Sequence, residues 1–493
     1  MRRHLTLTAV CLLAAAAVAS AAQGEIPSRP EKLVFGPMEW NIPDAESLRF
    51  ELANGTPVYA LRDSQFPLVN IAVYFRGGGY LVPVGREGLE TLADEVWRTG
   101  GAGERTAGEL DEELDFLAAN LMINIGDVTG SVSLNVLAKD LDAAMALMMD
   151  VLTKPRFQED RFAKAKDDLV QDMKTRNDNT ARIEGREWNR LIYGDDYFLN
   201  RLPTQATVAA LTPEMARDFV TSLVRSDNIV VAVSGDFEDA AIKALLERTV
   251  GTLPALDEPL PPIPQPTHTP EPGVYVIDKP DVNQARVSYG HLGYRLGDPA
   301  EFALMVGNDI LGGGGFTARM MKTIRSDEGL AYSAYSAVGF PTSYPGTVRA
   351  FFQTKSSTCA YATEIGFGLL EEMRTSPVTA EELTVSKNQF IETFPRNFAS
   401  AAQTVSVFAV DELLGRSHDY WKSYRDRVAA VDADSVLAAF RTKVRPDDMV
   451  ILVVGNLAEI TAGHPDHESQ LSDFGPIVEM PLRDPLTLEP ITE

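Results

Sequence analysis

Two blocks of the chain repeat each other at a spacing of 220 residues, and this duplication limits the folds that the chain can adopt. Residues 224–235 and 444–455 each pass from a short polar turn into an apolar run that ends at a glycine. Such a run is typical of a buried strand that ends in a tight turn. A second matching pair of strand patterns, 69–80 and 284–294, lies near the start of each half. Matching blocks in the same order predict a tandem duplication of one domain.

Eight prolines between positions 254 and 272 separate the two copies. Proline fixes φ and lacks a backbone donor, so this stretch is predicted to be an extended, semi-rigid linker. We therefore expect one domain at 40–253, a second at 273–460, and a C-terminal tail at 461–493. Within each copy the strand patterns cluster and do not alternate with helices. This order favours an α+β fold class with two tandem homologous domains.

Composition excludes several classes of protein. A hydrophobic content of 45% with 23% charged residues indicates a folded globular chain. The formal charge of -25 argues against a nucleic-acid partner, because a phosphate surface requires a basic footprint. Two cysteines cannot form a disulfide scaffold or a Cys-rich metal site. We expect Cys359 to be a core thiol on a strand.

The first 22 residues have the pattern of a secretory signal peptide. Arg2 and Arg3 precede an apolar run at 5–18 and a small-residue stretch at 19–22. The pattern predicts export, with the periplasm as the compartment, and no membrane association after cleavage. The alternative is an uncleaved membrane anchor.

Two further blocks carry a family resemblance. Residues 311–319 read LGGGGFTAR, and residues 324–333 read IRSDEGLAYS. This pattern resembles the second half of the insulinase/pitrilysin family of zinc peptidases, which includes mitochondrial processing peptidase. The resemblance extends over about residues 41–460. It implies two similar α+β domains that form half of a clamshell around an extended peptide.

Active members of that family carry a His-x-x-Glu-His motif on a helix of the first half. Two His four residues apart share one helix face, a distant carboxylate completes the zinc site, and the Glu is the general base. Here the two His positions are Thr91 and Glu95, the base position is Asp94, and the third ligand falls near Asp172. No histidine occurs in 40–253.

The resemblance therefore implies no metal or other cofactor in this chain and places the zinc in a partner. Oxygen ligands alone are poorly suited to catalytic zinc. A weak Mg²⁺ or Ca²⁺ site at Asp94, Glu95 and Asp172 is one alternative. A second is a metal pair at His464 and His467, which has no third ligand nearby in the sequence.

A second family element is retained. In active members an Arg and a Tyr seven residues apart hold the scissile peptide and stabilise the oxyanion, and they correspond to Arg325 and Tyr332. The alternative is an Arg paired with Asp327 or Glu328 and a Tyr packed on the sheet.

The resemblance also implies that the glycine-rich loop binds substrate. The residues concerned are Gly312, Gly313, Gly314, Gly315 and Phe316. The alternative is a glycine helix cap. The edge strand that receives substrate in active members corresponds to residues 121–124, which depart from the family pattern but retain main-chain donors for strand addition.

These features predict a zinc-less subunit of an exported heterodimeric metallopeptidase. It would be inactive alone, bind an extended peptide, and present Arg325 and Tyr332 to zinc held by a paralogous subunit. If acidic groups line the chamber, basic peptides are favoured. The alternative function is a peptide-binding or scaffold protein with no part in hydrolysis.

Overall fold

The computed structural model describes residues 29, 33, 41–256 and 258–491. The chain divides into two compact units, residues 1–41 and 42–493, and the fold below is that of the second. The predicted signal peptide lies outside the described residues. No helix in the described part of the chain is long and apolar enough to cross a membrane.

The first half forms a six-stranded sheet in the order β1-β2-β6-β3-β5-β4. Its strands are β1 (Arg49–Glu51), β2 (Pro57–Arg62), β3 (Leu68–Arg76), β4 (Asn120–Ile125), β5 (Thr129–Leu137) and β6 (Ile229–Gly235). The pair β2–β6 is parallel, and all other neighbours are antiparallel. Buried and half-buried residues alternate along β3 and β5, because successive side chains of a strand point to opposite faces.

The second half forms a sheet in the order β12-β7-β11-β8-β10-β9. Its strands are β7 (Gly273–Asp278), β8 (Gln284–Leu292), β9 (Ala331–Val338), β10 (Thr347–Lys355), β11 (Val450–Gly455) and β12 (Ile477–Glu479). From β7 to β9 the order and strand directions repeat those from β2 to β4. The predicted α+β class with two similar halves is therefore confirmed.

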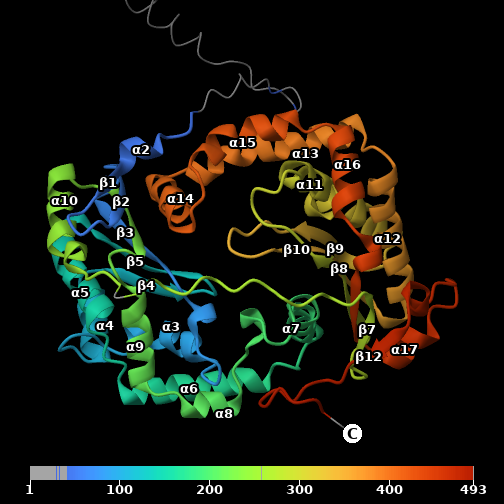
Figure 1. Cartoon of the computed structure of the whole chain (residues 1–493), viewed down its shortest axis with the longest axis horizontal. Helices are drawn as coiled ribbons and strands as arrows, with labels where there is room; N and C mark the ends of the chain where they lie inside the picture. The colour runs from blue at the N-terminus through green and yellow to red at the C-terminus, as the bar shows by residue number, and fades with distance from the viewer. Residues whose placement is uncertain (1–28, 30–32, 34–40, 257, 492–493) are drawn as a thin grey trace, which may run out of the picture. The chain divides into compact units, whose positions relative to one another are not determined.

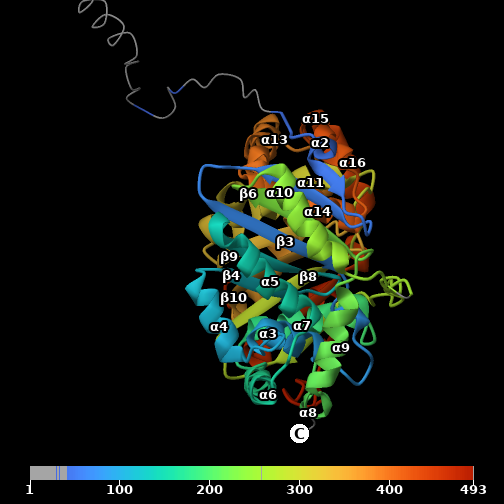
Figure 2. The same cartoon turned by 90° about the vertical axis from the view of Figure 1, so that its left-hand side faces the viewer.

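The helices of the first half are α2 (Ala45–Leu48), α3 (Leu89–Thr99), α4 (Ala107–Phe116), α5 (Leu141–Thr153), α6 (Glu159–Lys174), α7 (Thr180–Tyr193), α8 (Gln205–Ala210), α9 (Pro213–Leu223) and α10 (Asp239–Arg248). Helices α5, α9 and α10 lie on the outer side of the first sheet (Figure 2). One hydrophobic core forms on that face of the sheet, where its apolar side chains pack with those of α3, α5 and α9.

The helices of the second half are α11 (Glu301–Asn308), α12 (Cys359–Thr375), α13 (Ala380–Thr393), α14 (Ala401–Leu414), α15 (Asp419–Ala430), α16 (Ala433–Lys443) and α17 (Leu457–Ala462). A second core forms between α11, α12, α16 and the second sheet. Cys359 is buried in it, as expected for a core thiol. Its expected place on a strand is wrong, because β10 ends at Lys355 and Cys359 begins α12.

Each half also packs one helix on the sheet of the other half. Helix α7 contacts β8 and β11 of the second sheet, whereas α14 contacts β2, β3 and β6 of the first. Figure 1 shows the green α7 beside the second sheet and the orange α14 beside β1 and β2. This exchange buries both faces of β6 and β11, so their side chains form continuous apolar runs.

Ion pairs accompany the exchanged helices. Glu184 of α7 accepts hydrogen bonds from Arg349 and Ser288 of the second sheet. Glu412 of α14 accepts hydrogen bonds from Arg49 at 2.9 Å and from the Tyr59 hydroxyl at 2.6 Å. These contacts join residues that lie more than 100 positions apart.

The connecting segments also touch both halves. Residues 254–256 and 258–272 form no helix or strand. Tyr80 and Tyr197 donate their hydroxyl protons to Pro261 and Pro264 within this stretch. Near the C-terminus β12 joins the second sheet, and Leu486 accepts a hydrogen bond from Gln205 of the first half.

Candidate functional site

Helix α3 carries three of the four degenerate zinc-motif positions. Its apolar side, including Leu92, Ala93, Val96 and Trp97, is buried in the first core. The opposite side presents Thr91 and Glu95 to solvent, with Asp94 half-buried. The helix thus orients these positions as an i, i+3, i+4 motif requires, but no imidazole is present.

Asp94 is engaged by the edge strand β4. Its Oδ1 accepts a hydrogen bond of 2.6 Å from the backbone N–H of Ile125. Gly126 donates to Thr129 of β5, so the alternating ladder directs the N–H of Ile125 away from β5, toward the free edge. Burial raises the pKa of Asp94, and the bond from Ile125 opposes that rise. Asp94 therefore closes one end of the free edge of β4.

Asp172 lies on α6 and is paired with Arg182. Its two carboxylate oxygens accept bonds of 2.7 Å and 2.9 Å from one guanidinium nitrogen. Among the described residues, no group of three or more His, Cys, Asp or Glu side chains is placed to hold a metal ion. Asp94, Glu95 and Asp172 therefore do not form the cluster that the alternative Mg²⁺ or Ca²⁺ site requires.

His464 and His467 lie in the second half, after α17. The His467 ring stacks on Tyr361 with 3.7 Å between ring centroids. Neither histidine belongs to a metal-binding group in the described part of the chain. The residues present do not fit a zinc site, because the motif positions lack nitrogen ligands and Asp172 is already paired.

The glycine-rich stretch begins inside one π-helical segment, Asp309–Gly313, and ends before a second, Met321–Asp327. π-Helical segments are rare in proteins, and many of those that occur lie at functional sites. Gly312 packs against β9, where an added Cβ would lie 2.3 Å from the backbone nitrogen of Ser336. Gly315 has φ +63°. The chain therefore continues through Gly312 and Gly313 as a π-helix, and α11 ends earlier, at Asn308.

Arg325 and Tyr332 meet beside this loop. The Arg325 guanidinium lies 5.1 Å from the centre of the Tyr332 ring and 4.7 Å from that of Phe316. The two rings are 86% and 74% exposed. No ion pair to Arg325 forms with any residue that the structure describes, Asp327 and Glu328 included. The structure therefore brings together the predicted Arg and Tyr with one member of the predicted loop.

A cavity of about 600 Å³ lies behind the loop. Asp309, Phe316 and Lys322 line it, together with α13. On its wall Arg319 donates two hydrogen bonds, of 2.7 Å and 2.8 Å, to Glu382. These bonds lower the pKa of Glu382 to about 2.

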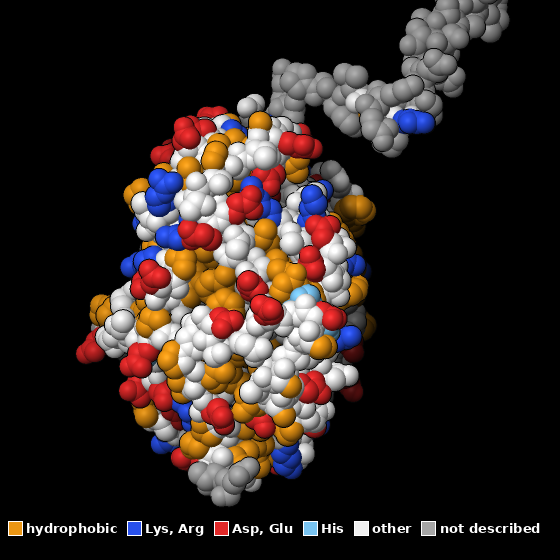
Figure 3. Space-filling model, turned by 90° about the vertical axis from the view of Figure 1, so that its right-hand side faces the viewer, with side chains coloured by type: hydrophobic (Ala, Val, Ile, Leu, Met, Phe, Trp, Pro, Cys, Tyr) orange, Lys and Arg blue, Asp and Glu red, His pale blue; other side chains and the backbone are white. Residues whose placement is uncertain are grey.

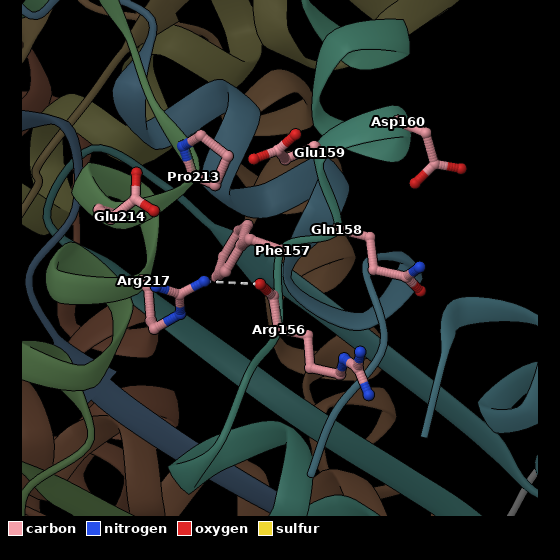
Figure 4. A pocket seen from close by; sticks show the side chains of 8 residues that line it. All are labelled: Arg156, Phe157, Gln158, Glu159, Asp160, Pro213, Glu214 and Arg217. Carbon is pink, nitrogen blue, oxygen red and sulfur yellow. Dashed lines mark hydrogen bonds between the residues drawn. The ribbon is translucent and has the colours of Figure 1, made fainter. Parts of the chain in front are cut away.

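A second cavity, of about 740 Å³, lies where α6 and α9 begin (Figure 4). Its two arginines are already bound to main-chain oxygens: Arg217 donates to Pro155 and Arg156, and Arg156 donates to Glu104. None of the predicted site residues lines this cavity.

Comparisons with known proteins show a similarity to one family of peptidases. The family profile described as "Peptidase M16 inactive domain" matches residues 210–390. Over these residues the chain is similar to the M16 (insulinase/pitrilysin) family of peptidases. Because the profile describes an inactive domain, this match indicates a non-catalytic, peptidase-like chain.

The chain is similar to two curated bacterial proteins over most of their length. It is 23% identical to "Uncharacterized zinc protease YmxG" of Bacillus subtilis, with 82% of this chain and 97% of that protein covered. It is 21% identical to "Non-peptidase homolog YmxG" of Helicobacter pylori, with 81% and 92% covered.

Two solved structures share the M16 fold. The peptidase M16 inactive domain from Pseudomonas fluorescens has a TM-score of 0.74 at 22% identity and covers 83% of this chain and 98% of its own. The periplasmic protease PqqL from Escherichia coli has a TM-score of 0.73 at 16% identity. That alignment covers 88% of this chain and 49% of PqqL.

Sequence reasoning missed two features of the site. The stacking of Phe316 on Arg325 joins a 3₁₀ turn, Gly315–Thr317, to the π-helical segment Met321–Asp327, and no simple sequence period marks either element. The polar face of the first sheet also went unnoticed, although the alternation of Asn and Ser with Val and Leu along β5 carries that signal.

Proposed function

We propose that this chain is the zinc-less subunit of an exported heterodimeric metallopeptidase. In this proposal it binds an extended peptide and presents Arg325 and Tyr332 to zinc held by a paralogous subunit. The observation that carries the proposal is the exposed arrangement of Arg325 between the rings of Phe316 and Tyr332. Among the described residues Arg325 has no acidic partner, and the Tyr332 ring is exposed to solvent. Both side chains are therefore available to bind a ligand.

The assignment of roles follows from chemistry. The Arg325 guanidinium can donate two parallel hydrogen bonds to peptide carbonyls. The Tyr332 hydroxyl can donate to an oxyanion that develops during hydrolysis. Helix α3 offers no zinc ligands, so the metal and its bound water must come from another chain.

Two observations support the assembly and the compartment. The alignment with the periplasmic protease PqqL covers only 49% of that protein, as expected if PqqL joins two units of this kind in one chain. The pattern of residues 1–22 favours export. The domain division at 40–253 and 273–460 is part of the proposal, and it assigns the pair Arg325 and Tyr332 to the second domain.

The test is peptidase activity on a fluorogenic peptide. This chain, a candidate M16 partner with an intact zinc motif, and their mixture are assayed in parallel. We expect activity above that of the partner alone only in the mixture. Tyr332→Phe in this chain should lower kcat of the mixture about 100-fold, the range for loss of one oxyanion donor.

Arg325→Ala should lower the activity of the mixture as well, whereas Lys322→Ala, an exposed change in the same π-helical segment, should leave it unchanged. A mixture no more active than the partner alone would defeat the proposal. Binding of peptide without any gain in hydrolysis would favour the alternative, a peptide-binding scaffold.

A further inference from the structure

Strand β9 contains a β-bulge at Tyr332. Two residues of β9, Tyr332 and Ser333, lie opposite one residue of β10, Gln353. Ala331 and Ala334, on either side of the bulge, both contribute to the second core, although a regular strand would place residues three positions apart on opposite faces. A bulge redirects side chains in this way and often lies next to an active site. The additional residue therefore lets Tyr332 be exposed between two core alanines.

A buried hydroxyl holds the chain at the start of this bulge. Thr354, the β10 residue paired with Ala331, is 1% exposed, and its Oγ1 donates a hydrogen bond of 2.7 Å to the carbonyl of Leu330. The Thr358 hydroxyl lies 2.9 Å from the same Oγ1. Since the single proton of Thr354 is directed at Leu330, Thr358 is the donor in this second contact. The two threonines therefore form a short chain of hydrogen bonds that ends at the Leu330 carbonyl.

Leu330 also joins the bulge to the π-helical segment that carries Arg325. Its N–H donates a hydrogen bond of 2.9 Å to the carbonyl of Ile324, the residue before Arg325. Leu330 is thus held on both sides, through its N–H by the segment of Arg325 and through its carbonyl by Thr354. Arg325 and Tyr332 therefore stand at the two ends of a connection that Thr354 holds in between.

Both threonines act inside the protein. Thr358 is 6% exposed and belongs to a 3₁₀ turn, Ser356–Thr358, that packs against α17. Figure 3 shows acidic side chains scattered over the surface beside α12 and α17, and the two hydroxyls are buried beneath it. A ligand therefore does not reach them, and any effect of Thr354 on the chemistry passes through the bulge.

We propose that Thr354 is a positioning residue for the shared active site: its hydroxyl holds the connection from Arg325 to the β9 bulge and so places the Tyr332 ring beside the Arg325 guanidinium. The inference rests on the proposed function, in which this pair contacts substrate. Without the hydroxyl the Leu330 carbonyl would lose its donor, which is costly inside a protein. The connection would then shift to bring that carbonyl to water, and Tyr332 would move with it.

The experiment uses the mixture of this chain with a candidate partner that has an intact zinc motif. Thr354→Val keeps the shape and the branched Cβ of the side chain, so the fold should be kept, but it removes the hydroxyl. We expect kcat on the fluorogenic peptide to fall about tenfold, with KM changed less than about twofold, because a displaced Tyr332 affects the reaction more than binding. Thr354→Ser retains the hydroxyl and should keep kcat within about twofold of the wild type.

A second variant and a matched control locate the effect. Thr358→Val removes the donor that orients the Thr354 hydroxyl and should lower kcat about threefold. Thr363 is fully buried in α12, and its hydroxyl donates a hydrogen bond of 2.7 Å to the carbonyl of Cys359. Thr363→Val therefore removes an equally buried hydroxyl that does not touch β9, and it should leave kcat unchanged.

NMR spectra of the isolated chain test the geometry directly. The Arg325 guanidinium lies 5.1 Å from the centre of the Tyr332 ring, so its side-chain signal senses the ring current. That signal should shift in Thr354→Val, because the ring moves away, and should stay in place in Thr354→Ser and Thr363→Val.

The outcomes separate the two proposals. An active mixture in which Thr354→Val and Thr358→Val match the wild type in kcat would overturn the positioning role while the proposed function stands. An equal loss in Thr354→Ser or Thr363→Val would also overturn it, because the loss would then reflect general destabilisation. A mixture no more active than the partner alone would defeat the proposed function, and the Arg325 signal would still show whether Thr354 places Tyr332.

Discussion

The carboxylate of Asp94 accepts a 2.6 Å hydrogen bond from the N–H of Ile125, so the residue at the family's general-base position holds the edge strand in place. In an active member this position serves the zinc-bound water. Here α3 lies against β4, and the carboxylate makes a structural contact with that strand.

Asp94→Ala should release the end of β4. The hydrogen bond joins a carboxylate to a half-buried strand end, so its loss should lower the free energy of unfolding by about 1–2 kcal/mol. Amide hydrogen exchange of Ile125 should accelerate in the variant. Glu95→Ala, on the next residue of the same helix, is the control, and equal exchange in both variants would contradict the assigned contact.

Phe316→Ala should weaken the function assigned to Arg325. A cation–π contact at an exposed site contributes about 0.5–1 kcal/mol, so peptidase activity of the mixed subunits should fall about threefold to fivefold. Phe316→Tyr keeps an aromatic ring and should retain activity. In NMR spectra of the isolated chain the Arg325 side-chain protons should shift downfield in Phe316→Ala alone, because the ring current is lost.

Glu184→Ala should destabilise the packing of α7 on the second sheet. The side chain is 2% exposed and satisfies Arg349, which would remain without its acidic partner. Removal of one member of a buried pair costs about 3 kcal/mol or more, measurable by urea unfolding. Asp172→Ala breaks an exposed pair with Arg182 and should cost less than about 1 kcal/mol. A similar loss of unfolding free energy in the two variants would contradict the prediction that Glu184 stabilises the packing of α7 on the second sheet.

The contribution of Glu382 to the stability of the fold should be lost at acidic pH. Hydrogen bonds from Arg319 lower its pKa in the folded protein to about 2, against an ordinary value of 4.5. A carboxyl with a lowered folded pKa stabilises the fold above the unfolded pKa and loses this effect as pH falls from about 4.5 to about 2. The difference in unfolding midpoint between the wild type and Glu382→Gln should therefore be large at pH 7 and small near pH 2. Glu381→Gln, at the adjacent position, should show no such trend.

Local sequence patterns predicted much of the fold correctly. Residues 229–235 and 450–455 form strands at equivalent places in the two sheets, because an apolar run of that length before a glycine suits a strand buried on both faces. The motif positions fell on one helix, α3, because its apolar residues repeat with a helical period.

Other features depend on contacts that no local pattern contains. Cys359 was expected on a strand, but the apolar residues after it have their partners in α16, and that packing makes the segment a helix. The edge-strand contact of Asp94 depends on where β4 lies relative to α3.

The sequence by itself determined that this chain has two copies of an α+β fold, that its first copy lacks zinc-binding imidazoles, and that an Arg and a Tyr stand seven residues apart in the second. Composition and short-range periodicity suffice for such features, since they depend on residues close in the chain. Tertiary structure alone decided that α7 and α14 exchange sheets, that Glu184 pairs with Arg349, and that Asp94 contacts the edge strand β4. Each of these requires groups distant in sequence to pack together, and packing of that kind follows from the whole fold.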